Sequence, residues 1–324
     1  MCTAISFNKF NHYFGRTLDL EYHYAEEVVI APRNFNFNLR FEPQFNPHYA
    51  VIGVATVFDG VPLYYDGVNE FGLCAAGLNF VGNAVFFDYA EGKNNVAAYE
   101  FIPWILSKYK TVSELKEVLK NTNLVKVPFN SNLPVPTLHW IISDKSESIT
   151  VESAADGLKV YENIIGVLTN NPEFPYHVTN LSNYINLTSE VPFNRFSSEL
   201  NIKPYSKGMG LMGLPGDWSS TSRFVRASFA LHNSLYPHGE DDAISQFFHI
   251  LNTVSNIKGT VHLGGGKYEY TIYTSCYDSS KGILYYTTYE NGQINAVKLN
   301  NESLDSSELV RYPLLNKQKT NYIN

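Results

Sequence analysis

MCTAISF, residues 1–7, opens the chain and places Cys2 directly behind the initiator methionine. Methionine aminopeptidases remove Met when the next side chain is small, so Cys2 can become the mature N-terminus. An α-amine titrates near ~8 and a thiol near ~8.5, so the amine can accept the thiol proton close to neutral pH. Removal of Met1 would therefore place a nucleophile and its base on one residue.

The next polar cluster along the chain is GRTLDL, residues 15–20, which contains Arg16 and Asp19. An arginine near the thiol favours the thiolate, and a carboxylate can hold the α-ammonium group. The same residues have plainer interpretations. A Cys at position 2 is more often a small residue of a first strand, and Arg and Asp three apart are more often a surface ion pair. This pattern alone leaves both interpretations open.

The composition indicates a globular protein with ample material for a core. Of the 324 residues 44% are hydrophobic and 17% charged, with 23 Tyr and 21 Phe, which is unlike a disordered chain. A net charge of −7 without any Lys/Arg run argues against nucleic acid as a partner. Apolar runs such as FIPWIL at 101–106 are too short to span a bilayer. We expect a cytoplasmic protein folded as one domain over residues 1–324.

The cysteines and histidines show no spacing that predicts a metal site. Cys2, Cys74 and Cys276 form neither a CxxC pair nor a zinc pattern, so free thiols are expected, with Cys74 and Cys276 in the core. The nine His lack HExxH or HxH spacing. GGG at 264–266 lacks the strand-to-helix setting of a phosphate-binding loop. No metal and no cofactor are predicted.

Hydrophobic periodicity predicts strands at both ends of the chain. Apolar runs at 2–7 and 12–18, separated by NKFN, suit a hairpin. Tight turns are predicted at Asp156-Gly157 and at Asn291-Gly292. Further strand-like runs lie at 28–32, 50–58, 62–68, 72–80, 138–143, 148–153, 268–277, 283–290 and 294–299.

Two pairs of helices are predicted between these strands, at 99–109 with 111–120 and at 222–235 with 242–254. Thr111 and Glu114 form a capping box ahead of the second helix. Two stacked antiparallel sheets, each covered by one helical pair, would bury all the apolar faces. We therefore predict an α+β fold, a four-layer αββα sandwich.

Several long motifs, in order and over nearly the whole chain, resemble the choloylglycine hydrolase family and within it the bile salt hydrolases. They are MCTAISF (1–7), HYFGRTLDLEY (12–22), YYDGVNEFGLCAAGLNF (64–80), VLTNNPEF (167–174), GLPGDWSSTSRFVRASF (213–229), YEYTIYTSCYD (268–278) and LYYTTYEN (284–291). Members of the family are N-terminal nucleophile hydrolases, which implies the αββα fold already predicted.

The resemblance implies a role for each matched residue. Cys2 matches the nucleophile, and Arg16 and Asp19 match the pair that positions its thiol and amine. Asn79 matches a position whose backbone N–H contributes to the oxyanion hole, and Asn170 the one whose side-chain amide completes it. Without the resemblance, both Asn residues are better explained as turn residues.

Arg223 of STSRF matches the family arginine that supports the charges near the nucleophile. Arg226, one helical turn later, has the same residue type, and only the motif separates the two. A position near the start of a predicted helix is otherwise an ordinary place for a solvated charge.

The resemblance implies conjugated bile salts as substrates, each a steroid joined to glycine or taurine. Such a substrate needs a broad apolar wall and a polar mouth. Three loops, at 20–26, 58–65 and 127–136, are rich in aromatic residues, Pro and Leu, although plain surface loops can share this composition. The candidate wall residues are Leu20, Tyr22, Tyr24, Phe58, Leu63, Tyr65, Phe129 and Leu133.

Two other functions compete with bile salt hydrolysis. Penicillin V acylase has the same nucleophile and fold, but it typically carries Tyr where this chain has Asn79. A non-catalytic bile-acid binder would not need Cys2. The irregular segment 188–217 contains SKGMGLMGLPGD and matches the region through which family members form tetramers, so a homotetramer is expected.

Overall fold

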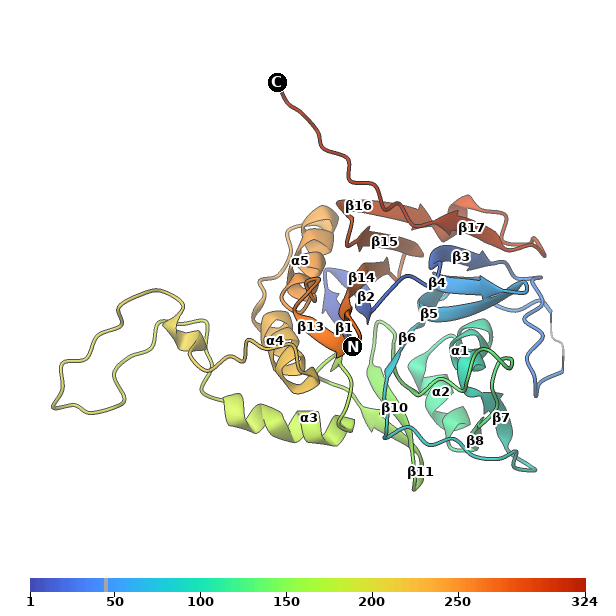
Figure 1. The fold of residues 1–324 in the computed structure, drawn as a ribbon, viewed down its shortest axis with the longest axis horizontal. Helices are drawn as coiled ribbons and strands as arrows, with labels where there is room; N and C mark the ends of the chain where they lie inside the picture. Colours follow the sequence, from blue (N-terminus) through green and yellow to red (C-terminus); the bar gives the residue numbers. More distant parts are fainter. Residues whose placement is uncertain (44–45) are drawn as a thin grey trace.

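The computed structural model describes residues 1–43 and 46–324 of the chain. Two antiparallel sheets lie face to face at its centre, and helices cover the outer face of each sheet (Figure 1). The order of layers is helix, sheet, sheet, helix, so the predicted αββα sandwich is confirmed.

The first sheet is built around the N-terminal hairpin. Strand β1 (Cys2–Lys9) pairs with β2 (Asn11–Leu20) in a register that sets Cys2 opposite Leu18. Nearly every residue of β2 is buried, because one face meets the second sheet and the other meets helices. The remaining strands of this sheet are β12 (Val167–Leu168), β13 (Val261–Gly264), β14 (Lys267–Asp278), β15 (Ile283–Thr288) and β16 (Asn291–Lys298).

The second sheet carries the middle of the chain and closes with a C-terminal strand. Its order, from one edge to the other, is β11 (Gly157–Glu162), β10 (Ser148–Ala154), β9 (Leu138–Ser143), β6 (Cys74–Asn79), β5 (Val61–Asn69), β4 (Val51–Phe58), β3 (Glu27–Ala31) and β17 (Val310–Pro313). A separate parallel pair joins β7 (Asn94–Ala97) to β8 (Thr122–Val125).

Each sheet is covered by one of the two predicted helical pairs. Helices α4 (Ser220–Asn233) and α5 (Glu240–Asn252) pack on the first sheet, and α1 (Phe101–Lys108) and α2 (Val112–Leu119) on the second. The N-terminus of α2 is capped as predicted, since Thr111 Oγ1 accepts the Glu114 N–H at 3.2 Å. In a capping box the Glu114 carboxylate would accept the N–H of Thr111, but here it accepts the N–H of the preceding residue, Lys110.

Two apolar clusters follow from these layers. One fills the space between the sheets and under α4 and α5, with Phe7, Phe14 and Tyr277 among its members. The other lies between the second sheet and α1 and α2, around Trp104 and Trp140. Cys2, Ala4, Ile5 and Phe7 of β1 all belong to the first cluster, which holds Cys2 at a defined place.

Some elements differ from the prediction. The turn between β15 and β16 lies at Tyr289-Glu290, because Thr288 pairs with Asn291. Asn291 begins the next strand, and its amide donates to the Leu315 carbonyl at 2.9 Å, so a distant segment determines its place. A helix that the sequence did not predict, α3 (Phe174–Asn180), follows the TNNP motif.

Between α3 and α4 the chain extends away from the rest of the molecule in a long loop (Figure 1). It contains the short 3-10 helix η3 (Met209–Leu211) and many exposed apolar side chains. Among the helices of the described residues, none is long and apolar enough to cross a membrane.

Candidate active site

Cys2 is the first residue of β1 and is only 2% exposed. Its backbone N–H donates to Oδ1 of Asn170 at 2.8 Å. Met1 precedes it, so this nitrogen is a peptide nitrogen here. The contact ties the start of the chain to a residue 168 positions later.

Asn170 connects the parts of the site. Its Oδ1 also accepts from Nη2 of Arg223 at 2.7 Å, and its Nδ2 donates to the Asn79 carbonyl at 2.8 Å. A primary amide nitrogen has two hydrogens, so the second N–H of Asn170 can serve another acceptor. The Asn170 side chain therefore joins Cys2, Arg223 and Asn79, residues that lie far apart in the sequence.

Arg223 is fully buried on α4 and points toward the start of β1. Its Nη1 donates to the Cys2 carbonyl and, at 2.7 Å, to Oγ1 of Thr3. Burial lowers the pKa of Arg223, and the nearby Asp19 and Cys2 oppose that shift. Arg226 instead donates to the carbonyls of Pro215 and Thr253, away from Cys2.

Arg16 lies where two strands of the second sheet separate. The ladder between β5 and β6 runs from Val68–Cys74 to Asp66–Ala76. Just beyond it, Nη1 of Arg16 donates to the carbonyls of Tyr65 and Gly77, one from each strand. The guanidinium group thus supplies the hydrogen bonds that the parted strands no longer give each other.

A buried carboxylate accompanies Arg16. Asp66 Oδ2 lies 4.0 Å from Nε of Arg16, and the hydroxyls of Tyr273 and Tyr277 donate to the same carboxylate. Burial raises the pKa of Asp66, while Arg16 and the two tyrosines oppose this shift. Sequence reasoning did not single out Asp66, because its partners lie on strands of the other sheet.

Asp19 lies beside the N-terminus. Its carboxylate accepts from Thr271 at 2.7 Å and from Thr17 at 3.3 Å, and its backbone carbonyl accepts from the Met1 amine at 3.1 Å. The amine also pairs with Glu269. Burial lowers the pKa of this Met1 amine.

A cavity of about 480 Å³ opens beside Cys2, between the parted strands. Its wall is formed mainly by apolar and aromatic side chains, and Arg16 and Asn79 also line it. Seven of the eight predicted wall residues line this cavity: Leu20, Tyr24, Phe58, Leu63, Tyr65, Phe129 and Leu133. Ile102, Pro134 and Trp140 line it as well, although the sequence did not single them out.

Tyr22 is the exception among the predicted wall residues. It is 45% exposed, and its ring packs on that of Tyr24 with 4.6 Å between the ring centroids. It is absent from the described residues that line the cavity.

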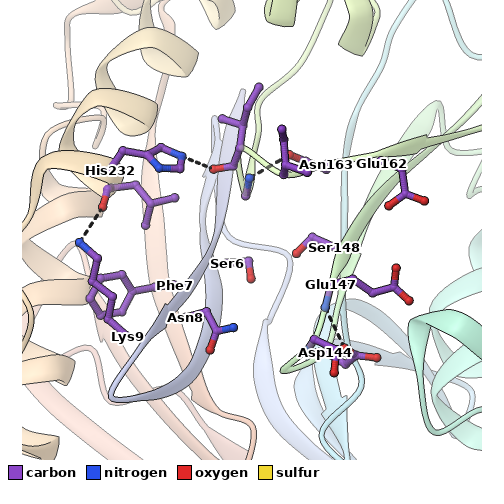
Figure 2. Close-up of a pocket in the computed structure, with 15 residues that line it drawn as sticks. Ser6, Phe7, Asn8, Lys9, Asp144, Glu147, Ser148, Glu162, Asn163 and His232 are labelled. Atoms are coloured by element: carbon purple, nitrogen blue, oxygen red, sulfur yellow. Dashed lines mark hydrogen bonds between the residues drawn. The ribbon is translucent and has the colours of Figure 1, made fainter.

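A second hollow of about 400 Å³ lies at the opposite end of β1 (Figure 2). The charged groups around it already have partners within the fold. Figure 2 shows Lys9 pointing to the end of α4, where its amine donates to the Leu231 carbonyl. Glu147 and Glu162 both pair with Lys116. None of the predicted catalytic residues is among the described residues that line it.

No group of three or more His, Cys, Asp or Glu in the part of the chain that the structure describes could hold a metal ion. A thiol, two buried arginines and amide donors lie beside an apolar cavity, and removal of Met1 would add a free amine on Cys2. These groups can cleave an amide through a covalent intermediate.

The stacked antiparallel sheets, with Cys2 at the start of the first strand, define the fold of the N-terminal nucleophile hydrolases. A solved penicillin V acylase from Agrobacterium tumefaciens has this fold, with a TM-score of 0.77 at 18% identity over 96% of this chain and 90% of that chain. At this identity the similarity concerns the fold alone.

Closer relatives narrow the assignment. The model of the linear amide C–N hydrolases, choloylglycine hydrolase family, matches residues 2–312. The bile salt hydrolase/transferase of Lactiplantibacillus plantarum is 48% identical over 324 residues, which is 100% of both chains. A variant of the conjugated bile acid hydrolase from Clostridium perfringens has a TM-score of 0.93 at 39% identity, again over 100% of both chains. The chain belongs to the choloylglycine hydrolase family and is an amidohydrolase.

Proposed function

We propose that this enzyme hydrolyses the amide bond of glycine- or taurine-conjugated bile acids, with Cys2 as the nucleophile after removal of Met1. The observation that carries the proposal is the Asn170 side chain, which joins Cys2, Arg223 and Asn79 beside the apolar cavity. The names of the L. plantarum and C. perfringens relatives support this substrate class.

The first half of the reaction forms a thioester. The free amine of Cys2 accepts the thiol proton, and the thiolate attacks the amide carbonyl carbon of the substrate. Negative charge develops on the carbonyl oxygen, where the backbone N–H of Asn79 and the second N–H of Asn170 would donate. Loss of one such donor typically costs about 3 kcal/mol of transition-state stabilisation. The C–N bond then breaks, and the leaving glycine or taurine takes the proton from the Cys2 ammonium group.

The second half releases the bile acid. A water molecule gives a proton to the Cys2 amine and attacks the thioester carbon, and the C–S bond breaks to restore the thiol. An amine that attacks the same thioester would receive the acyl group instead of water. The name of the L. plantarum relative includes a transferase activity.

The two arginines and Asp19 have distinct positions in this scheme. Arg16 lines the cavity beside Cys2 and provides positive charge that favours the thiolate. Arg223 holds the Cys2 carbonyl and Oδ1 of Asn170, which orients both. Asp19 lies beside the N-terminus and would anchor the ammonium form of the amine.

The experiment measures release of glycine from glycocholate and of taurine from taurocholate, with penicillin V as a parallel substrate. Wild type is compared with Cys2→Ala, and Cys276→Ala is the matched control because Cys276 is a buried thiol that is not among the described residues lining the cavity. Intact mass establishes whether Met1 has been removed. We expect cleavage of the bile salts by wild type and by Cys276→Ala, and none by Cys2→Ala.

Other results would favour the alternatives. A strong preference for penicillin V would make the enzyme an acylase of that type. Absence of all cleavage by protein that lacks Met1 would contradict the catalytic proposal, and bile-acid binding would then be measured directly. We also expect a cytoplasmic homotetramer that assembles through residues 188–217.

A further inference from the structure

Two buried histidines hold the backbone next to the central residue of the site. Nε2 of His139 lies 3.0 Å from the Thr169 carbonyl, and Nε2 of His177 lies 2.8 Å from the Asn170 carbonyl. A carbonyl oxygen can only accept, so Nε2 carries the proton in both rings. Two consecutive carbonyls are thus each held by one imidazole N–H.

His139 is itself firmly fixed on β9. Its ring stacks on Phe80, with 4.3 Å between the ring centroids and an interplanar angle of 7°. Its Nδ1 lies 3.0 Å from Oε1 of Glu152, which also accepts the N–H of Phe174. Phe80 directly follows Asn79, and Thr169 directly precedes Asn170. The His139 ring therefore contacts the chain next to both residues that are expected to form the oxyanion hole.

His177 approaches the same backbone from α3. It is fully buried and stacks on Phe224 of α4, with 4.8 Å between the ring centroids. Phe224 directly follows Arg223, the partner of Asn170 Oδ1. The α3 helix begins at Phe174, whose N–H is held by Glu152, so both histidines depend on the same carboxylate.

The N–H of Asn170 also has a partner. The Asn170 N–H donates to Oγ of Ser220 at 2.8 Å, and Ser220 Oγ donates to Oγ1 of Thr169 at 2.9 Å. A shift of this backbone would move the Asn170 amide away from Cys2 and Asn79 together. Buried histidines that bind backbone carbonyls often serve stability alone, so the test must separate the two roles.

We propose that His139 and His177 are positioning residues that hold the Thr169–Asn170 backbone, and through it the Asn170 amide, in the geometry needed for amide cleavage. This inference rests on the proposed function. Neither imidazole is among the described residues that line the cavity, so their effect is expected on kcat and not on substrate binding.

The test compares His177→Leu, which removes the donor, with His177→Gln, whose side-chain N–H can replace Nε2–H. The same pair is made at His139. With glycocholate as substrate, we expect the Leu variants to lose kcat on the order of 10- to 100-fold, as small misplacements of a catalytic group do. KM should stay within about twofold, and the Gln variants should recover most of kcat.

His12 provides the matched control. It is buried like the other two, but its nitrogens bind the hydroxyls of Ser6, Ser143 and Ser279 at the opposite end of β1. His12→Leu should lower the free energy of unfolding without changing kcat of the folded enzyme. Intact mass must show that Met1 is removed from every variant compared.

The outcomes separate this inference from the proposed function. A wild type that cleaves bile salts, together with His177→Leu and His139→Leu variants that keep kcat, overturns the positioning role alone. The same conclusion follows if His12→Leu loses as much kcat, or if folded Gln variants recover nothing. A wild type that cleaves neither bile salts nor penicillin V overturns both proposals.

Discussion

The carboxylate of Asp66 lies 4.0 Å from Nε of Arg16, and both side chains are completely buried. Removal of one partner from a buried ion pair leaves an uncompensated charge, at a typical cost of about 3–5 kcal/mol. We therefore expect Asp66→Asn to lower the free energy of unfolding by about 3 kcal/mol. Urea denaturation of the variant and wild type measures this difference.

An exposed ion pair provides the control for this substitution. Asp305 lies 2.9 Å from Arg33, with side chains 77% and 36% exposed. Because water screens such pairs, Asp305→Asn should cost less than about 1 kcal/mol. Equal effects of the two substitutions would mean that burial of Asp66 with Arg16 has no special importance for stability.

The three thiols should differ in reactivity toward an alkylating reagent. Burial raises the pKa of Cys74 and of Cys276 well above that of a free thiol, and both are completely buried. Cys2 lines the cavity beside Arg16. Brief treatment of the native enzyme with iodoacetamide should therefore modify Cys2 alone, in parallel with loss of activity. Peptide mass spectrometry identifies the modified residue, and early alkylation of Cys74 or Cys276 would contradict this prediction.

Acidification should destabilise the fold through its buried histidines. Burial lowers the pKa of His12 and of His177 to about 4, whereas an unfolded chain titrates near ~6.5. Between these pH values the unfolded state binds more protons than the folded state. The contribution of these histidines to stability is therefore complete above pH ~6.5 and is lost as the pH falls toward 4. The expected loss is about 3 kcal/mol for each histidine at the acid end.

Urea unfolding at several pH values between 7 and 4.5 measures this slope. His12→Gln should flatten it, because one titrating group is removed. An unchanged slope in that variant would mean that other groups govern the acid sensitivity. His12 is the better choice here, since its distance from Asn170 leaves the catalytic geometry unaffected.

The sequence predicted those parts of the fold that depend on local pattern. The apolar runs at 2–7 and 12–18 indicate a hairpin, and Thr111 with Glu114 indicates a helix start, because the interacting groups are close in the chain. The turn that the sequence places at Asn291-Gly292 lies two residues earlier, at Tyr289-Glu290. Its register depends on Asn291 and a contact with Leu315, which no local pattern reveals.

The same limit applies to the site. Cys2, Arg16 and Asp19 lie on one hairpin and could be connected from local chemistry, whereas Asn170 and Arg223 were placed only through the resemblance. His139 and His177 gave no signal at all. Their acceptors are backbone carbonyls, which every residue possesses, and their ring partners Phe80 and Phe224 lie more than 40 residues away in the sequence.

The cavity wall should control affinity for the steroid. Leu63 lines the cavity, while Tyr22 lies outside its lining. Leu63→Ala removes apolar contact worth roughly 1–2 kcal/mol, so KM for glycocholate should rise about tenfold with little change in kcat. Tyr22→Ala is the matched control and should leave KM within about twofold. Steady-state kinetics that give the reverse order would show that the steroid binds elsewhere.

The loop between α3 and α4 should carry the contacts between subunits. Phe193, Phe196 and Tyr205 are 69%, 83% and 82% exposed, although large apolar side chains seldom project into water as a group. Substitution of Phe193 and Phe196 by Ser should therefore convert a tetramer into smaller species without unfolding the body of the enzyme, from which this loop extends (Figure 1). Light scattering coupled to size exclusion gives the mass of both proteins. A wild type with the mass of one chain, 36.6 kDa, would contradict the proposed assembly, and a variant that stays tetrameric would place the contacts outside this loop.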